Sequence, residues 1–305
     1  MISARPAILL ATLCLCSCRG PAQSRDLPEL VQRELATPHV LGVVQLKAPQ
    51  RGFNGISGMA YDGSRVTAIT DMGYWLRFRL EVDREGRPVS AGGLEIGKLG
   101  GLDGTKGDSD AEELVWTPEG WLVSFERRHR VMLYADGLEG KATPLAMPQG
   151  FTRQPGNGGV EAITRLADGR LLMLSEEGGN QDDTGWGWVG RPGAWDSLRY
   201  QREGHFRPSG AATLPNGDVL VTQRSFTLLG GFGFRLMRIA RNDIRPGALL
   251  VGREIMRLDS SQLVDNFEAV AVRPRADGRL VAYILSDDNI NPLQATLLMA
   301  VLLPD

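Results

Sequence analysis

The sequence predicts an all-β protein, a β-propeller of five four-stranded blades whose ring is closed by an N-terminal strand. One hairpin unit recurs five times, as a short apolar strand, a glycine-containing turn and a second apolar strand that ends in a charged residue. The units repeat at roughly 50 residues, which is the period of a propeller blade. A single hairpin cannot bury both of its faces, so the units must pack against one another. Six blades are the alternative, although no sixth copy of the unit occurs.

Each copy begins its first strand on Ser or Glu and ends its second strand on a charged residue. Two-residue turns such as Asp168-Gly169 separate the two strands, and such turns are typical of β-hairpins. The paired positions, in chain order, are Ser57 with Asp71, Glu112 with Glu126, Glu161 with Glu176, Ser209 with Arg224, and Glu268 with Asp287.

The last blade lacks a strand of its own. After Glu268 only three strands are predicted before the chain ends, the third over residues 295–303. Residues 39–48 are strand-like and precede the first repeat. We expect this segment to supply the missing outer strand, because a ring closed by both ends of the chain leaves no open sheet edge.

The N-terminal segment has the features of a targeting sequence. Arg5 precedes an apolar stretch over residues 7–16, so residues 1–17 are predicted to be a signal peptide. Leu15-Cys16-Ser17-Cys18 resembles a bacterial lipoprotein box, with Cys18 as the lipidated residue; an ordinary cleaved signal is the alternative. We therefore expect a periplasmic or cell-envelope lipoprotein, or else a secreted protein.

Residues 18–38 are predicted to form a tether before a propeller domain over residues 39–305. Leu27, Leu30, Val31 and Leu35 follow helical spacing, which predicts one or two turns of helix within the tether. All three cysteines lie in the N-terminal segment, so the propeller is expected to contain no disulfide.

Composition excludes some classes of partner. The 34 basic and 36 acidic residues nearly balance, which gives no electrostatic case for nucleic-acid binding. Beyond the N-terminal segment no apolar run approaches the roughly 20 residues of a membrane-spanning helix. We expect a monomer that contacts the membrane only through its lipid anchor and binds a small molecule or an anionic ester.

The repeat predicts where polar side chains gather. In a propeller the innermost strands surround a central channel and begin at one mouth. The paired positions should therefore form a polar ring of up to seven carboxylates with one guanidinium. Such carboxylates repel one another, so the ring should hold a cation, share protons or pair with arginines. Alternatively, each Glu accepts hydrogen bonds from a neighbouring blade and serves only to lock the ring.

Oxygen ligands without His or Cys favour Ca²⁺ or Mg²⁺ over zinc. We expect Ca²⁺, and the candidate ligands are Glu112, Glu161, Glu268, Asp287 and Asp71. Ser57, Arg127 and Ser209 are candidate ligand-binding residues at the same mouth. Nucleophile motifs are missing, because Gly55-Ile56-Ser57-Gly58 is not G-x-S-x-G and the three histidines have no triad-like or metal-ligand spacing.

Four motif pairs follow one another along the chain: Asn54-Gly55-Ile56-Ser57-Gly58 with Thr70-Asp71, Asp110-Ala111-Glu112-Glu113-Leu114 with Glu126-Arg127, Gly156-Asn157-Gly158-Gly159-Val160-Glu161 with Ser175-Glu176, and Asn266-Phe267-Glu268-Ala269 with Ser286-Asp287-Asp288-Asn289. Their order resembles the phytase-like family described as having esterase-like activity of phytase. The resemblance extends from about residue 39 to the C-terminus. Asp108-Ser109-Asp110-Ala111-Glu112 is also similar to the acidic blade motif of calcium-dependent propeller phytases.

The resemblance implies hydrolysis of an ester or phosphoester bond. In this hypothesis the carboxylates hold a divalent cation, Glu126 or Glu176 acts as general base, and Arg224 holds the anion. A non-catalytic envelope protein that binds a small ligand or partner at the mouth is the alternative. A lactonase of the gluconolactonase type is a third possibility, although the motif order of that type does not occur here.

Overall fold

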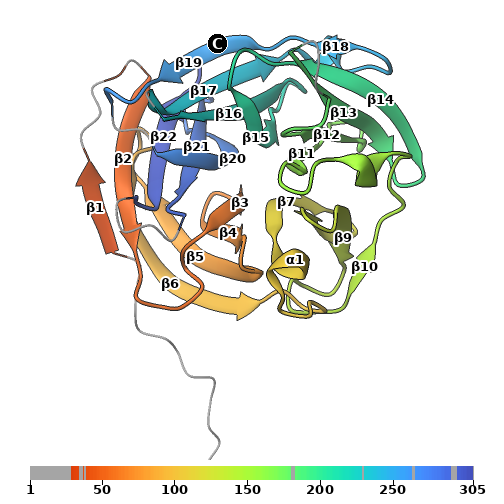
Figure 1. Ribbon diagram of the computed structural model, residues 1–305. Coiled ribbons are helices and arrows are strands. Elements are labelled where there is room, and N and C mark those ends of the chain that lie inside the picture. Colours follow the sequence, from red (N-terminus) through yellow and green to blue (C-terminus); the bar gives the residue numbers. More distant parts are fainter. Residues whose placement is uncertain are drawn as a thin grey trace, which may run out of the picture.

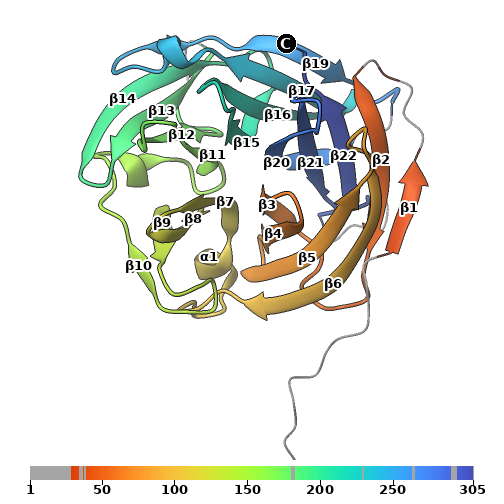
Figure 2. The same ribbon diagram turned by 180° about the vertical axis from the view of Figure 1, so that it is seen from behind.

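The computed structural model of the chain describes residues 29–33, 37, 39–179, 183–228, 230–262, 265–289 and 294–304. Five sheets stand side by side around a common centre (Figure 1). Their innermost strands pack against one another around that centre in the order β3, β7, β11, β15 and β20. The same ring is seen from behind in Figure 2. The predicted five-bladed propeller is confirmed.

The first two blades are four-stranded antiparallel sheets. Blade one consists of β3 (Ile56–Tyr61), β4 (Arg65–Thr70), β5 (Tyr74–Val82) and β6 (Pro88–Lys98). A loop with the short helix α1 (Lys106–Ser109) leads to blade two, which consists of β7 (Ala111–Thr117), β8 (Gly120–Phe125), β9 (Arg130–Tyr134) and β10 (Ala142–Pro144).

The strand expected as the fourth of blade four is divided between blades three and four. Blade three consists of β11 (Val160–Arg165), β12 (Leu171–Ser175), β13 (Thr184–Arg191) and β14 (Ala194–Gln201), and a short 3-10 turn, η1 (Phe151–Arg153), precedes it. Blade four consists of β15 (Arg207–Thr213), β16 (Val219–Thr227), β17 (Gly231–Ile239) and β19 (Arg253–Leu258), with η2 (Arg241–Asp243) after β17. The fourth strand expected over residues 249–258 is divided: β18 (Leu249–Leu250) pairs in parallel with β14 of blade three, and only β19 belongs to blade four.

Blade five closes the ring as predicted. It consists of β20 (Asn266–Pro274), β21 (Leu280–Asp287) and β22 (Leu297–Leu302), and β2 (Val40–Lys47) completes it by pairing with β22. A further strand, β1 (Glu29–Arg33), pairs along the outer edge of β2. The helix expected within residues 18–38 is therefore wrong over Glu29–Arg33, because pairing covers an edge of β2 that would otherwise be open. The folded part of the chain consequently begins before residue 39.

Apolar side chains fill the space between neighbouring blades. The inner strands are buried almost throughout; every residue of β12, for example, is buried. Between blades four and five, Phe234 and Phe267 pack edge to face with ring centroids 5.2 Å apart. Because this core surrounds the centre on all sides, the inner strands are held in fixed positions, which is what a site at their ends requires.

The predicted signal peptide, residues 1–17, and the predicted lipidation site, Cys18, lie outside the described residues. In the part of the chain that is described, no helix has the length and apolarity to cross a membrane.

Candidate functional site

Every inner strand carries a β-bulge at the position that the repeat singled out. The pairing register shifts between Ile56 and Gly58, Ala111 and Leu114, Val160 and Ala162, Pro208 and Gly210, and Phe267 and Ala269. A bulge leaves one residue outside the ladder and turns its side chain in a new direction. The five predicted residues, Ser57, Glu112, Glu161, Ser209 and Glu268, therefore occupy equivalent positions near the start of the inner strands.

The two serines at these positions connect neighbouring blades. Ser57 Oγ donates to the carbonyl oxygen of Ala111 at 2.7 Å, and Ser209 Oγ donates to that of Phe267 at 3.0 Å. Both side chains are buried. Each hydroxyl thus bonds to the residue that precedes the bulged Glu of the next blade. These bonds give both serines a structural role in the ring, in addition to the ligand-binding role expected of them.

Arg224 joins three carboxylates from three parts of the chain. Its Nη2 lies 3.2 Å from Glu161 Oε2 and 3.1 Å from Glu176 Oε1, and its Nε lies 3.3 Å from Glu268 Oε1. Asn266 Nδ2 donates to Glu268 Oε1 at 2.8 Å. The sequence placed these residues on one mouth, and the structure brings them into contact. Pairing with an arginine is thus how the blade-three and blade-five carboxylates are partly neutralised.

One guanidinium cannot balance three carboxylates, and the pKa values follow from that imbalance. Burial, and then repulsion from Glu176, Glu268 and Glu126, raises the pKa of Glu161 even though Arg224 opposes the change. Burial works against the charge on Arg224, but the carboxylates of Glu161, Glu268 and Glu176 raise its pKa well above the usual value. We infer that Arg224 is always charged and that the carboxyl groups of Glu161 and Glu268 retain protons above the usual carboxyl range.

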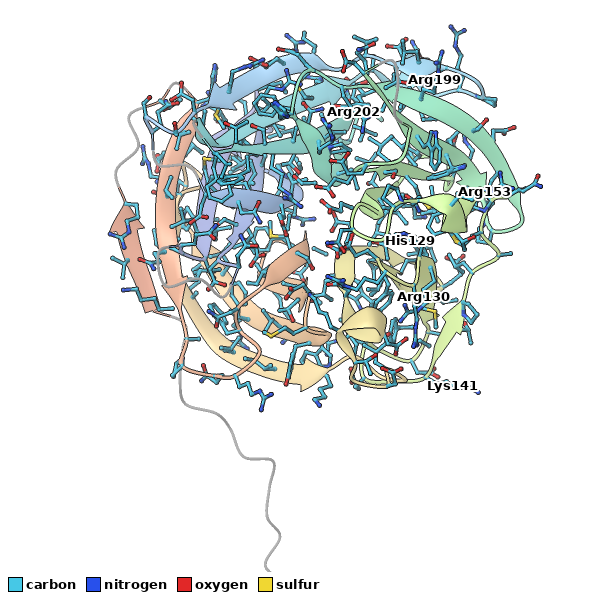
Figure 3. The ribbon with its side chains drawn as sticks, in the orientation of Figure 1. His129, Arg130, Lys141, Arg153, Arg199 and Arg202 are labelled. Carbon is cyan, nitrogen blue, oxygen red and sulfur yellow. The ribbon has the colours of Figure 1, made fainter. Side chains whose placement is uncertain are left out.

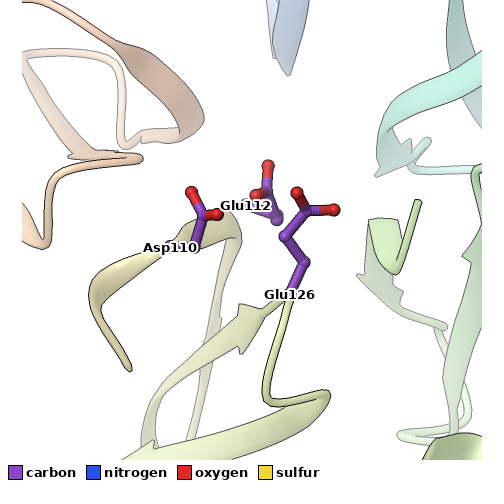
Figure 4. Close-up of side chains that lie close together, drawn as sticks. All are labelled: Asp110, Glu112 and Glu126. Atoms are coloured by element: carbon purple, nitrogen blue, oxygen red, sulfur yellow. The ribbon is translucent and has the colours of Figure 1, made fainter. Parts of the chain in front are cut away.

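Blade two contributes a second acidic cluster on its side of the mouth. One oxygen each from Asp110, Glu112 and Glu126 lie within 4.8 Å of one another. Figure 4 shows the three carboxyl groups turned toward one another from β7 and its approach and from the end of β8. Glu126 is oriented by the backbone of blade three, since Gly158 N–H donates to its Oε2 at 2.7 Å. Among the described residues the Glu112 carboxylate has no hydrogen-bond or ion-pair partner.

Two cations already contact Asp110. Lys106 Nζ meets one of its carboxylate oxygens and Arg127 Nε meets the other. Arg127 has a φ of +56°, in the left-handed region that costs a non-glycine residue roughly 1 kcal/mol. That conformation places its guanidinium beside Asp110, and the hydrogen bond to Asp110 raises the pKa of Arg127. Burial, and then repulsion from the carboxylates of Glu161, Glu126 and Glu268, raises the pKa of Glu112 well above its usual value.

The remaining predicted carboxylates, Asp71 and Asp287, lie at the ends of the second strands of blades one and five. Lys106 Nζ contacts Asp71 Oδ2 at 2.7 Å, so one lysine bridges Asp71 and Asp110. Burial and the nearby charges of Asp71 and Asp288 raise the pKa of Asp287 to about 7, although the Asn289 N–H opposes the rise. Lys106 was not predicted, because it lies in a glycine-rich loop that carries no repeat signal.

Glu113 fills the channel below the mouth. Its side chain is 1% exposed; Leu114 N–H donates to Oε1 at 2.9 Å and Ala211 N–H to Oε2 at 3.4 Å, from the far side of the ring. A side chain at Gly58 would begin only 2.8 Å from Glu113 Oε1, so blade one also closes on this carboxyl group. Burial raises the pKa of Glu113 well above its usual value, which favours the neutral form in the folded protein. The sequence did not predict the role of Glu113, because the extra residue of the β7 bulge decides the direction of its side chain.

Arg128 and His129, which follow Arg127 at the end of β8, bond to groups outside the two acidic clusters. His129 Nε2 bonds to the carbonyl oxygen of Pro155 at 2.8 Å, and Arg128 pairs with Asp103 and Asp108 in the loop around α1. Figure 3 places Arg153 nearer the outer edge of the ring than His129. None of these three takes part in the two acidic clusters as the structure describes them.

The charges at the mouth do not balance. In the described part of the chain nine carboxylates surround it, those of Asp71, Asp110, Glu112, Glu126, Glu161, Glu176, Glu268, Asp287 and Asp288. Three cationic side chains, Lys106, Arg127 and Arg224, contact them. A divalent cation fits the remaining deficit, and oxygen donors are what Ca²⁺ and Mg²⁺ prefer. Among the described residues no cationic side chain pairs with the Glu112 or Glu126 carboxylate, whereas Asp110 would share its oxygens with Lys106 and Arg127.

The cluster of Asp110, Glu112 and Glu126 differs from the set of metal ligands expected from the sequence, which was Glu112, Glu161, Glu268, Asp287 and Asp71. The structure brings Glu112 together with Asp110 and Glu126, while Glu161 and Glu268 contact Arg224 and Asp71 contacts Lys106. The motif Asp108-Ser109-Asp110-Ala111-Glu112 contained a signal for Asp110. No local signal could show that Arg224 reaches both neighbouring blades.

The sequence of residues 51–290 matches the family model described as "Phytase-like: Esterase-like activity of phytase". This chain belongs to that family. The match includes every residue of both acidic clusters, so the mouth of this phytase-like propeller is part of what the family model describes. No curated protein matches the chain at a significant level.

Solved structures share the fold of this phytase-like propeller at low sequence identity. An α-L-arabinofuranosidase from Podospora anserina, solved with cellotriose, is 13% identical with a TM-score of 0.50, over 92% of this chain and 98% of that chain. An endo-arabinase from Bacteroides thetaiotaomicron is 11% identical with a TM-score of 0.49, over 88% and 97%. The likeness to the arabinofuranosidase, at 13% identity, supports the shared propeller fold alone and says nothing about the substrate.

Proposed function

We propose that this phytase-like propeller is a divalent-cation-dependent hydrolase of an ester or phosphoester. The observation that carries the proposal is the Glu112 carboxylate, which faces the mouth without a protein partner among the described residues and lies beside Asp110 and Glu126. Together with the family assignment, this arrangement supports a site for Ca²⁺ or Mg²⁺ held by Glu112 and Glu126, with Asp110 as a further ligand. Such a cation, when bound, polarises a carbonyl or phosphoryl oxygen and lowers the pKa of water.

The remaining polar residues of the mouth divide the other roles. Glu176 is the proposed general base, because only its Oε1 meets Arg224 and its Oε2 has no partner among the described residues. Arg224 is proposed to hold the oxygen on which negative charge develops. Its Nη2 donates to Glu161 and its Nε lies 3.3 Å from Glu268 Oε1, which orients the guanidinium, whereas Nη1 contacts no carboxylate in the described part of the chain.

The charge of the mouth favours a substrate with little negative charge. Lys106, Arg127 and Arg224 are all paired with carboxylates, and carboxylates outnumber them. A heavily phosphorylated substrate would meet net repulsion there. We therefore propose a neutral acyl ester or a simple phosphoester as the substrate class.

An apolar hairpin beside the mouth supports the proposal that the substrate is an ester with an apolar group. Phe226 follows Arg224 by two residues on β16, so it lies on the same face of the strand, about 7 Å further along it. Its ring packs on Phe232 with centroids 4.9 Å apart, yet Phe226 stays 56% exposed and Leu228 at the tip is 94% exposed. The proposal places the apolar part of the ester against this hairpin.

The proposed location is the cell envelope, with Cys18 as the lipid anchor. The lipobox-like sequence before Cys18 supports it. Metabolic labelling with a fatty-acid analogue tests it: the wild-type chain should be labelled and Cys18→Ala should not. Labelling of neither, with the protein released from the cell, would favour an ordinary secreted protein.

A metal-dependent assay tests the enzymatic proposal. Hydrolysis of 4-nitrophenyl acetate, octanoate and phosphate is measured after chelation and again after adding Ca²⁺, Mg²⁺ or Mn²⁺. We expect turnover that requires a divalent cation and a higher kcat/KM for octanoate than for acetate. Glu176→Gln should lower kcat at least about a hundredfold. A folded protein that hydrolyses none of the three esters with any cation would contradict the proposal.

A further inference from the structure

A groove lies at the opposite end of the strands from the acidic mouth, between blades two and three. It has a volume of about 310 Å³ and lies between the β7–β8 turn, the β11–β12 turn and the residues that follow β13. Its apolar floor consists of Leu122, Leu133, Leu145 and Leu171. The volume falls within the range of small-ligand sites, and an apolar floor with a few polar groups is their usual composition.

Two arginines occupy one end of this groove. The guanidinium groups of Arg165 and Arg191 both lie within 3.4 Å of the point where a side chain at Gly169 would begin. Gly169 has a φ of +81°, so both the turn and the space for the two arginines require glycine there. The two positive charges are therefore held close to each other above the apolar floor.

The two arginines differ in their partners. Arg191 donates to the carbonyl oxygens of Gly169 and Asp168, which fixes its position. The Arg165 guanidinium makes no hydrogen bond or ion pair with any residue that the structure describes. Asp168 is engaged by Arg170, and Glu119, which lines the other side of the groove, pairs with neither arginine in the described part of the chain. Asp168 also interacts electrostatically with Arg191, but Arg165, Arg170 and Arg191 together outnumber Asp168 and Glu119, so the arginine end carries net positive charge.

We propose that this groove binds an anionic amphiphile, a small molecule with an apolar chain and a single negatively charged head such as a carboxylate. The chain lies on the four leucines, and the head lies between Arg165 and Arg191. An arginine hydrogen-bonded to a carboxylate supplies both charge and directed donors. Since the groove is remote from the mouth, the proposal is independent of the hydrolase.

The experiment measures binding of octanoate, octan-1-ol and octylamine to the chain by calorimetry, with thermal unfolding as a second readout. We expect octanoate to bind at least about tenfold more tightly than octan-1-ol, the difference typical of a charged hydrogen bond, and octylamine not to bind measurably. Arg165→Gln should weaken octanoate binding about tenfold and leave octan-1-ol binding unchanged. Leu133→Trp, which fills the groove, should abolish binding of both.

Arg170→Gln is the matched control, because Arg170 belongs to the same turn, pairs with Asp168 and does not line the groove. It should bind octanoate like the wild-type chain. Unchanged circular dichroism and melting temperature establish that Arg165→Gln is folded. Three results would each overturn the proposal: no octanoate binding at millimolar concentration, equal affinity for octanoate and octan-1-ol, or an Arg165→Gln variant that binds octanoate as the wild type does.

Discussion

Arg224 and Glu161 are in contact across two blades: Arg224 Nη2 lies 3.2 Å from Glu161 Oε2, although the residues are 63 positions apart in the chain. The same guanidinium meets Glu176 and Glu268, so one cation joins blades three, four and five at their inner ends. The electrostatics of the mouth and the stability of the ring are therefore coupled, and changes at the mouth have consequences for folding that can be measured.

Removing Arg224 should destabilise the ring. Arg224→Met keeps most of the side-chain volume but leaves Glu161, Glu176 and Glu268 without their cation, and we expect a loss of about 3–5 kcal/mol in the free energy of unfolding at about pH 8. Urea denaturation measures it. The loss should shrink at about pH 5, because the raised pKa values of Glu161 and Glu268 favour their neutral forms there. Arg279→Met is the control, because Arg279 pairs with Asp277 on the surface. A loss no larger than in this control would contradict the account.

Without divalent cations the protein should become less stable as pH rises from about 5 to about 8. The folded state raises the pKa of Asp287 to about 7 and also raises those of Glu112, Glu161 and Glu268. The folded protein then retains protons that the unfolded chain releases near pH 4, so stability is fully present below that value and is lost as pH rises through about 7. Urea denaturation with a chelator present checks this. Stability that is flat or rises over that window would refute the raised pKa values.

The two inter-blade serine bonds should contribute similarly and independently. Ser57→Ala and Ser209→Ala should each lower the free energy of unfolding by about 1 kcal/mol, because each leaves a buried carbonyl oxygen without its hydroxyl donor. The double variant should lose the sum, since the two sites share no partner. Ser64→Ala, whose hydroxyl contacts Asp62 on the surface, serves as control. Losses equal to that of the control would show that these bonds do not stabilise the ring.

Glu113 should tolerate an amide but not truncation. Glu113→Ala removes the acceptor of backbone N–H groups from two blades and leaves a cavity, so we expect a loss of about 3–5 kcal/mol. Glu113→Gln keeps the side-chain volume and one carbonyl oxygen that can accept from Leu114 N–H, although its amide nitrogen cannot accept from Ala211 N–H, so it should lose less than half as much. Equal losses in the two variants would mean that both carboxyl oxygens are needed as acceptors.

The repeat made most of the fold predictable. Turn residues and apolar strands are local signals, so the five hairpins and the closing strand at residues 39–48 could be read directly. Strand β1 could not, because its pairing depends on the free edge of β2, which exists only once the ring has closed. The division of residues 249–258 between two blades likewise depends on where the neighbouring sheet lies.

The sequence predicted that the carboxylates gather at one mouth, but it did not predict which residues contact one another there. Equivalent positions in the repeat placed Glu112, Glu161 and Glu268 around one centre, and pairing with arginine was one of the expected outcomes. The structure of neighbouring blades decides which carboxylates contact the long side chain of Arg224 and which have no cationic partner. Lys106 comes from a loop, and the direction of Glu113 follows from a bulge. Neither feature has a signal in the sequence.

The most direct test of the central claim is calorimetric titration of the chelator-treated protein with Ca²⁺ and Mg²⁺ at about pH 7.5, in the wild type and in the Glu112→Gln and Glu126→Gln variants. The account predicts one divalent cation per wild-type chain and binding weakened at least about tenfold in each variant, whereas Glu85→Gln, changed on the surface beside Arg87, binds like the wild type. Absence of binding to the folded wild-type chain, or binding that both variants retain unchanged, would contradict it.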